Sequence, residues 1–109
     1  MAQNVSAPNS WIAEHLPGPQ QKFVDFAGKV YEDGALDRKT KELIAVAVSG
    51  QHRCRHCTRG HNKAALKAGA SKAEVAETLS VLSVIGGGTN VVWNKEGFEE
   101  HLHSVPHEE

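Results

Sequence analysis

Cys54-Arg55-His56-Cys57-Thr58-Arg59-Gly60-His61 is the most informative segment of the chain. On a helix with about 100° per residue, Cys57 lies about 60° from Cys54 and His61 about 20° from it, so the three side chains share one face. The N-terminus of a helix stabilises an anion, and the thiolate is the reactive form of cysteine. Cys57 and His61 are four residues apart, the spacing at which an imidazole can take or return a thiol proton. The segment therefore predicts a helix that carries a reactive thiol pair.

Helical signals dominate the chain upstream of this segment. Between Gln20 and Glu32, apolar side chains recur with the i, i+3, i+4, i+7 spacing of one helical face. The next helix is expected from about Arg38 to Gly50, with Asp37 as its N-cap. Its middle is apolar nearly all round, which predicts a buried helix, and a strand is the alternative there. These patterns favour an all-α fold.

Downstream of the segment, turn and capping residues predict further helices. The helix that carries the thiol pair is expected to end at Gly69, which suits a left-handed cap. Ser71, followed three residues later by Glu74, is a capping box that opens another helix. We expect the glycines at 86–88 to interrupt that helix, and a last helix to run from about residue 90 to 103. The total is about five to six helices, with Trp11 and Trp93 expected in the core or at a subunit interface.

Length and composition indicate a small single-domain protein. One domain is expected over residues 1–109, with a core from 20 to 103 and flexible ends at 1–10 and 104–109. The net charge is −1 and the basic residues are dispersed, so the sequence shows no cluster of positive charge of the kind that binds nucleic acid. No apolar run approaches the roughly 20 residues of a membrane span, and no secretory signal opens the chain. We therefore expect a cytoplasmic protein that, being short, associates into a homo-oligomer.

Glu42 is the second unusual residue. It stands near the start of the most apolar helix, on the same face as Ala45, Val46 and Ser49. Desolvation favours the neutral form of a carboxylate that enters a core, and this suits proton transfer near neutral pH. The alternative interpretation is an ordinary first-turn acid that the helix dipole favours.

The Cys-x-x-Cys pair also admits non-catalytic interpretations. Together with Glu42 and His61, the two cysteines could ligate zinc, although structural zinc sites usually draw on a second Cys/His pair. Two buried structural thiols are a further alternative, which the polar neighbours of the pair disfavour. A thioredoxin-like motif belongs beside a βαβ unit, and the chain shows no convincing strand. We predict neither a metal nor a cofactor.

At these residues the sequence resembles the alkylhydroperoxidase D-like branch of the carboxymuconolactone decarboxylase family. The pattern of that branch is a glutamate, eleven intervening residues, Cys-x-x-Cys, and a histidine four residues after the second cysteine. The residues here with that spacing are Glu42, Cys54, Cys57 and His61. His56 also resembles the His or Tyr often found just before the second cysteine. The resemblance extends over roughly residues 36–88.

The resemblance implies an all-α fold that assembles as trimers or hexamers, and a thiol-dependent peroxidase or disulfide reductase. The substrates would be alkyl hydroperoxides or hydrogen peroxide. Cys57 would attack the peroxide and Cys54 would resolve the sulfenic acid as a disulfide, although position on the helix alone favours Cys54 as the more activated thiol. Glu42 and His61 would move protons, with His56 in support. A dithiol or thioredoxin-like reductant would restore the pair.

Two other functions stay open. The decarboxylase branch of the family typically lacks the cysteine pair, so a decarboxylase-type lyase is the weaker enzymatic alternative. A zinc-binding or non-catalytic interaction module is the alternative outside catalysis.

Overall fold

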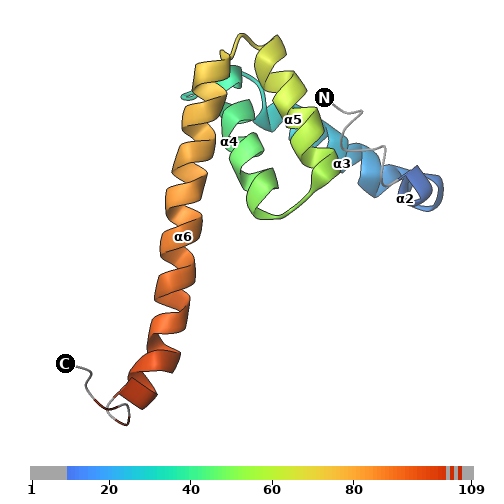
Figure 1. Cartoon of the computed structure of the whole chain (residues 1–109). Helices are drawn as coiled ribbons and strands as arrows, with labels where there is room; N and C mark the ends of the chain where they lie inside the picture. Colours follow the sequence, from blue (N-terminus) through green and yellow to red (C-terminus); the bar gives the residue numbers. More distant parts are fainter. Residues whose placement is uncertain (1–9, 103, 105, 107–109) are drawn as a thin grey trace.

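The computed structural model describes residues 10–102, 104 and 106, and the regular secondary structure of these residues is all helical (Figure 1). The predicted all-α fold class is therefore confirmed. The helices are α2 (Ser10–His15), α3 (Pro17–Val30), α4 (Arg38–Gln51), α5 (Arg55–Lys67) and α6 (Lys72–Leu102). The predictions made for residues 1–9, 103, 105 and 107–109 lie outside the described residues.

Helix α4 forms where the sequence predicts a helix, and a strand is excluded there. The Asp37 side chain caps it by accepting a hydrogen bond from the Thr40 N–H at 2.7 Å, and this bond lowers the pKa of the carboxyl group. The buried residues of α4 are those of the predicted face, Glu42, Ala45, Val46 and Ser49. On the opposite side Ile44 is 47% and Val48 50% exposed. The prediction of a helix buried nearly all round is therefore wrong, since only one face is covered.

The core lies where α4 meets α5. Val46, Ala65 and Ala70 form a buried cluster, with Leu43 and Val75 packed against it. Small side chains on the inner face of α5 let the two helices approach closely, because Gly60 and Ala65 are both buried there. The core is small, as expected from a short chain of modest apolar content.

Helix α3 forms where the sequence predicts a helix, but its apolar face is exposed. It begins at Pro17, three residues before the predicted start, because proline fits the first turn of a helix. It ends at Val30, ahead of Gly34. Its apolar stripe is open, with Phe23 53% and Phe26 65% exposed. The periodicity thus predicts an amphipathic helix but does not predict what covers its apolar face.

The capping box at the start of α6 is confirmed. The Glu74 N–H donates to Ser71 Oγ at 3.0 Å, and the Ser71 N–H donates to Glu74 Oε1 at 2.9 Å. From α4, the Lys39 ammonium group lies 2.8 Å from Glu74 Oε2. The hydrogen bond from Lys39, followed by that from the Ser71 N–H, lowers the pKa of the Glu74 carboxyl group. These contacts fix the first turn of α6 beside α4.

The predicted break at 86–88 and the separate last helix are wrong, because α6 runs unbroken from Lys72 to Leu102. Glycine lowers helix stability by about 1 kcal/mol relative to alanine, which is the basis of the predicted break. Glycine nevertheless keeps its backbone N–H, and the helix contains no proline, so its hydrogen-bond ladder continues. The predicted end of the helix that carries the cysteine pair is confirmed, because Gly69, just after α5, has a φ of 100°.

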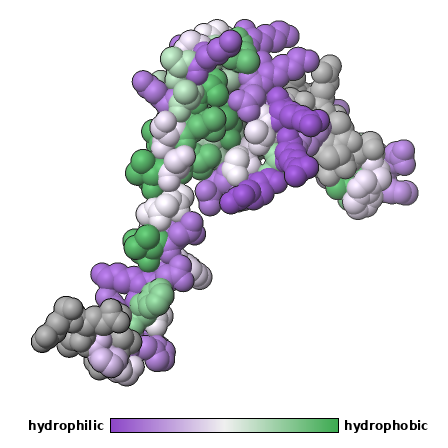
Figure 2. Space-filling model, in the orientation of Figure 1, coloured by the Kyte–Doolittle hydropathy of each residue, from purple (hydrophilic) through white to green (hydrophobic). Residues whose placement is uncertain are grey.

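The molecule is extended rather than compact. Helix α4 contacts both α5 and α6, while the C-terminal half of α6 runs away from them (Figure 1). The radius of gyration is 19.5 Å, whereas a compact domain of this length has about 13 Å. Trp11 is 62% and Trp93 84% exposed, so neither side chain packs in the core, which was one of the two expected positions. A position at a subunit interface stays a prediction. Figure 2 shows apolar surface along α6.

Helix α6 is long and apolar enough to cross a membrane, by length and composition alone. Its most apolar window has a mean hydropathy of 1.3, and none of that window is buried. The expected absence of a membrane span rested on the lack of an unbroken apolar run of about 20 residues. Helix α6 meets the broader criterion of length and mean hydropathy because it is one continuous helix in which glycine, serine, threonine and asparagine stand among the apolar residues. The charge-free part of α6 is bounded by Glu77 and Lys95, and its first turns pack on α4.

Candidate active site

Cys54 and Cys57 form a disulfide at the N-terminus of α5, with their Cα atoms 5.3 Å apart. Cys54 is the N-cap, and its Sγ accepts a hydrogen bond from the Cys57 N–H at 3.2 Å. Arg53, with a φ of 58°, turns the chain between α4 and α5, a conformation that costs a non-glycine residue about 1–2 kcal/mol. The Cys54 N–H donates to the Ser49 carbonyl of α4 at 3.1 Å. The turn thus anchors the cysteine pair to the last turn of α4.

Glu42 and His61 form a hydrogen-bonded pair between α4 and α5. The distance from His61 Nδ1 to Glu42 Oε2 is 2.8 Å. The Glu42 side chain is fully buried and that of His61 is 15% exposed. A carboxylate in its ionised form only accepts hydrogen bonds, and in that form Nδ1 would donate to Glu42 and leave Nε2 as the ring nitrogen that can exchange a proton. The arrangement can orient an imidazole and pass a proton.

The second oxygen of Glu42 is bound less tightly. Oε1 is buried and has no hydrogen-bond partner among the described residues. The half-exposed Arg38 places its Nη2 4.0 Å from this oxygen, close enough for an ion pair but too far for a hydrogen bond. Glutamate is almost never fully buried unless it is paired. A carboxylate kept in a small core by one hydrogen bond and one distant cation is poorly explained by stability alone, and this favours a chemical role.

Tyr31 belongs to the site, and the sequence analysis missed it. Its ring stacks on the imidazole of His61, with ring centroids 5.6 Å apart and an angle of 25° between the planes. Burial raises the pKa of the Tyr31 phenol, and the negative charge of Glu42 raises it further. Tyr31 is the C-cap of α3, thirty positions before His61 and outside the quoted motif, so no spacing rule within one helix connects the two residues.

The other predicted site residues lie around the cysteine pair. His56 and the neighbouring Arg55 are in the first turn of α5 and are exposed, and that turn contains no acidic residue. The supporting role of His56 stays a prediction, as does proton exchange between Cys57 and His61, which rests on their spacing of four residues within α5. The described geometry therefore joins the predicted residues in two pairs, the cysteines and Glu42–His61.

The zinc interpretation gains no support from this geometry. In the part of the chain that the structure describes, no three His, Cys, Asp or Glu side chains are grouped to hold a metal ion. The sulfur atoms of Cys54 and Cys57 are bonded to each other, whereas zinc takes separate thiolates.

Comparison with known families places this site in context. The family model described as "carboxymuconolactone decarboxylase family" matches residues 17–95, which include all the residues of the site. The chain belongs to the carboxymuconolactone decarboxylase family. The family includes both decarboxylases and peroxidases, so membership alone does not select the reaction.

Individual proteins are also similar to this chain. An uncharacterized protein in the cox locus of Paracoccus denitrificans is 39% identical over 66 residues, which are 61% of this chain and 60% of that protein. The chain thus spans less than two thirds of that relative. A crystal structure from Methanobacterium thermoautotrophicum has a TM-score of 0.72 at 36% identity and covers 80% of this chain and 98% of its own. A member of the family from Thermotoga maritima, with a candidate role in the antioxidative response, has a TM-score of 0.65 at 30% identity. The match covers 94% of this chain and 91% of that one.

Proposed function

We propose that the protein is a thiol-dependent peroxidase or disulfide reductase that reduces alkyl hydroperoxides or hydrogen peroxide. The observation that carries the proposal is the fully buried Glu42, hydrogen-bonded at 2.8 Å to His61 on the same helix as the cysteine pair. A buried carboxylate that orients an imidazole beside two redox-capable sulfurs is suited to coupled proton transfer and thiol chemistry.

The reaction consumes two thiols and one peroxide. The thiolate of Cys57 attacks the distal oxygen of the hydroperoxide, the O–O bond breaks, and the alcohol leaves with a proton supplied through His61. Cys57 is then a sulfenic acid. The thiol of Cys54 attacks that sulfur, which forms the disulfide and releases water. An external dithiol afterwards reduces the disulfide and is itself oxidised.

The disulfide also distinguishes this proposal from a decarboxylase-type lyase. Decarboxylation transfers no electrons to sulfur, so it has no use for a Cys54–Cys57 pair that can open and close. A cytoplasmic location belongs to the same proposal, because reductants there return such pairs to thiols.

Serine variants of the two cysteines test the proposal and the assignment of the attacking thiol. With dithiothreitol as reductant and cumene hydroperoxide as substrate, Cys57→Ser should abolish turnover. Cys54→Ser should lose the internal disulfide step and turn over only as fast as dithiothreitol reduces the sulfenic acid directly. Cys54→Ser should still form a sulfenic acid that dimedone traps, whereas Cys57→Ser should not. Turnover that survives both substitutions would refute the proposal, and dimedone labelling of only Cys57→Ser would reverse the two roles.

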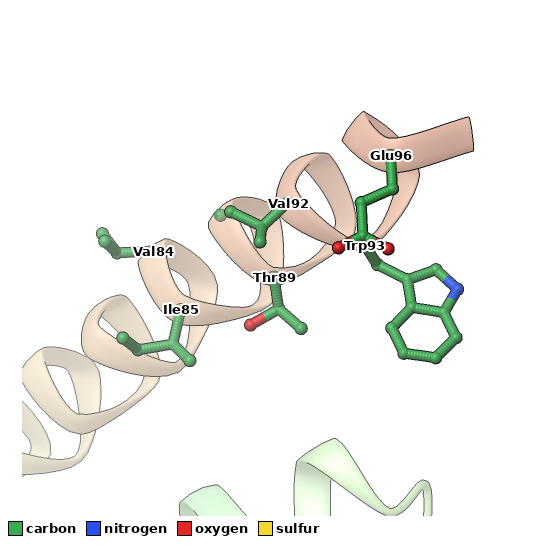
Figure 3. Close-up of a pocket in the computed structure, with 7 residues that line it drawn as sticks. Val84, Ile85, Thr89, Val92, Trp93 and Glu96 are labelled. Carbon is green, nitrogen blue, oxygen red and sulfur yellow. The ribbon is translucent and has the colours of Figure 1, made fainter. Parts of the chain in front are cut away.

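We further propose that the working form is a homo-oligomer, a trimer or hexamer, in which other copies cover the open face of α6. The exposed large apolar residues of this helix are Leu79, Val81, Val84, Ile85, Val91, Val92, Trp93 and Phe98. Figure 3 shows Val84 and Ile85 projecting from one turn of α6 and Val92 and Trp93 from a turn further on, with Thr89 between the two pairs, around a shallow pocket that α6 alone lines. Exposed apolar patches of this extent on soluble proteins mark interaction surfaces.

The accessible surface of the chain is large enough for contacts with other copies of it. The accessible surface is 8679 Å², whereas a compact monomer of 11.8 kDa exposes about 5,900 Å². Obligate homodimers bury about 2,000–5,000 Å² in total, or half of that on each chain. An excess of about 2,800 Å² is therefore large enough for contacts with other copies.

Sedimentation tests the assembly. The parent protein should sediment as a trimer or larger species, and Val84→Glu with Val92→Glu should shift it to the monomer. Ser83→Glu, on the opposite side of the same helix, is the matched control and should not. A parent that is monomeric at micromolar concentration would refute the proposal, and insertion of that monomer into phosphatidylcholine vesicles would identify lipid as the covering partner.

A further inference from the structure

We propose that Tyr31 is a positioning residue for His61, and that Lys41 holds Tyr31 in place. This inference rests on the proposed function for its kinetic consequence, while the arrangement itself rests on geometry alone. Neither residue belongs to the Glu–Cys–Cys–His pattern.

The hydrogen bond to Glu42 leaves one freedom to the imidazole of His61. A single bond at Nδ1 fixes which nitrogen faces the carboxylate, but the ring can still rotate about its Cβ–Cγ bond over the range of angles that keeps this bond. The Tyr31 ring lies nearly parallel to one face, at a centroid distance of 5.6 Å, and blocks that rotation. Nε2 is thereby kept in one direction, the property that a proton-transfer group needs.

Lys41 fixes the backbone that carries Tyr31. Its Nζ donates to the carbonyl of Val30 at 2.8 Å and to the carbonyl of Glu32 at 2.6 Å, the residues on either side of Tyr31. Charge-assisted hydrogen bonds of this kind are stronger than neutral ones. Lys41 precedes Glu42 in α4, so one helix orients His61 through Glu42 and orients its stacking partner through Lys41.

The electrostatics of Tyr31 agree with this arrangement. Burial and the charge of Glu42 raise the pKa of the phenol, so the ring stays neutral across the physiological range and adds no second negative charge beside the carboxylate. A neutral aromatic face is also compatible with the imidazole when it carries a proton during transfer, since the face of the ring attracts cations.

The test separates the ring of Tyr31 from its hydroxyl. In Tyr31→Phe the stack is kept, so the rate of thiol loss on adding cumene hydroperoxide should stay within about two-fold of the parent. In Tyr31→Leu the rate should fall about 2- to 13-fold, the factor that corresponds to the roughly 0.5–1.5 kcal/mol of one aromatic pair. Lys41→Met should lower the rate in the same direction, whereas Lys22→Met, an exposed lysine of α3, should not change it.

A spectroscopic measurement keeps the inference testable without activity. In the oxidised protein, the ring protons of His61 should show the upfield NMR shift that a stacked aromatic ring causes. The shift should survive Tyr31→Phe and disappear in Tyr31→Leu, and urea unfolding should show that each variant is folded. Unchanged His61 signals in Tyr31→Leu, or a Tyr31→Phe variant as slow as Tyr31→Leu, would overturn the positioning role. A parent whose thiols ignore peroxide would refute the proposed function, while the NMR result would still decide the stack.

Discussion

Replacing Glu42 with glutamine separates the chemistry of the site from its stability. The glutamine oxygen can still accept the hydrogen bond from His61 Nδ1, which is 2.8 Å away in the parent, but the negative charge is lost. Hydrogen bonds to charged groups contribute about 1.5–3 kcal/mol and neutral ones about 0.5–1.5 kcal/mol. The difference of about 1–1.5 kcal/mol corresponds to a rate of peroxide-dependent thiol oxidation about 5- to 13-fold lower.

The stability of the same variant should move differently. Glu42 is fully buried, and its Oε1 has no hydrogen-bond partner among the described residues, so burying its charge opposes folding. Glu42→Gln should therefore be as stable as the parent or more so. Glu42→Leu removes the acceptor as well, and its oxidation rate should fall further than that of Glu42→Gln.

Two assays measure these effects. Stopped-flow thiol titration after mixing with cumene hydroperoxide gives the oxidation rate, and urea unfolding gives the free energy of unfolding. Glu77→Gln, an exposed acid on α6, is the matched control and should change neither quantity. A Glu42→Gln variant that oxidises as fast as the parent would refute the relay. One that loses rate only in proportion to lost stability would show that Glu42 is structural.

The remaining predictions concern the helices that hold the site. The pKa values of the capping carboxyls Asp37 and Glu74 are lowered in the fold, so their stabilisation is present above their ordinary pKa values and is lost as pH falls through the lowered ones. Urea unfolding between about pH 6 and pH 3 should show this loss. Asp37→Asn keeps the cap without titrating and should lose its share of the pH dependence; an unchanged profile would contradict the role of the cap. Gly87 has open space around its Cβ position within the continuous α6, so Gly87→Ala should raise the free energy of unfolding by about 0.5–1 kcal/mol. Gly69 has a φ of 100°, so Gly69→Ala should lower the free energy of unfolding by about 1–2 kcal/mol. A stabilised Gly69→Ala variant would refute the left-handed cap.

Local rules predict the parts of the structure that short-range interactions decide. The Asp37 cap, the Ser71–Glu74 capping box and the turn at Gly69 each depend on residues within four positions of one another, and each is confirmed. The buried face of α4 is also predictable, because helical period alone places Glu42 in line with the apolar residues that face α5.

The remaining features depend on contacts between distant residues or on weak preferences. Tyr31 meets His61 only because α3 ends against α4, which no spacing within one helix reveals. The glycines at 86–88 lower helix propensity without ending the helix, since propensity is readily overridden. The apolar stripes of α3 and α6 identify amphipathic helices, but periodicity does not say whether the same chain or another copy covers them.

The most direct test of the account is a thiol count and intact mass of the reduced protein before and after one equivalent of cumene hydroperoxide. The account predicts that the two thiols of Cys54 and Cys57 disappear together, that the mass falls by about 2 Da, and that dithiothreitol reverses both changes. Two thiols that persist at unchanged mass would contradict a redox role for the pair.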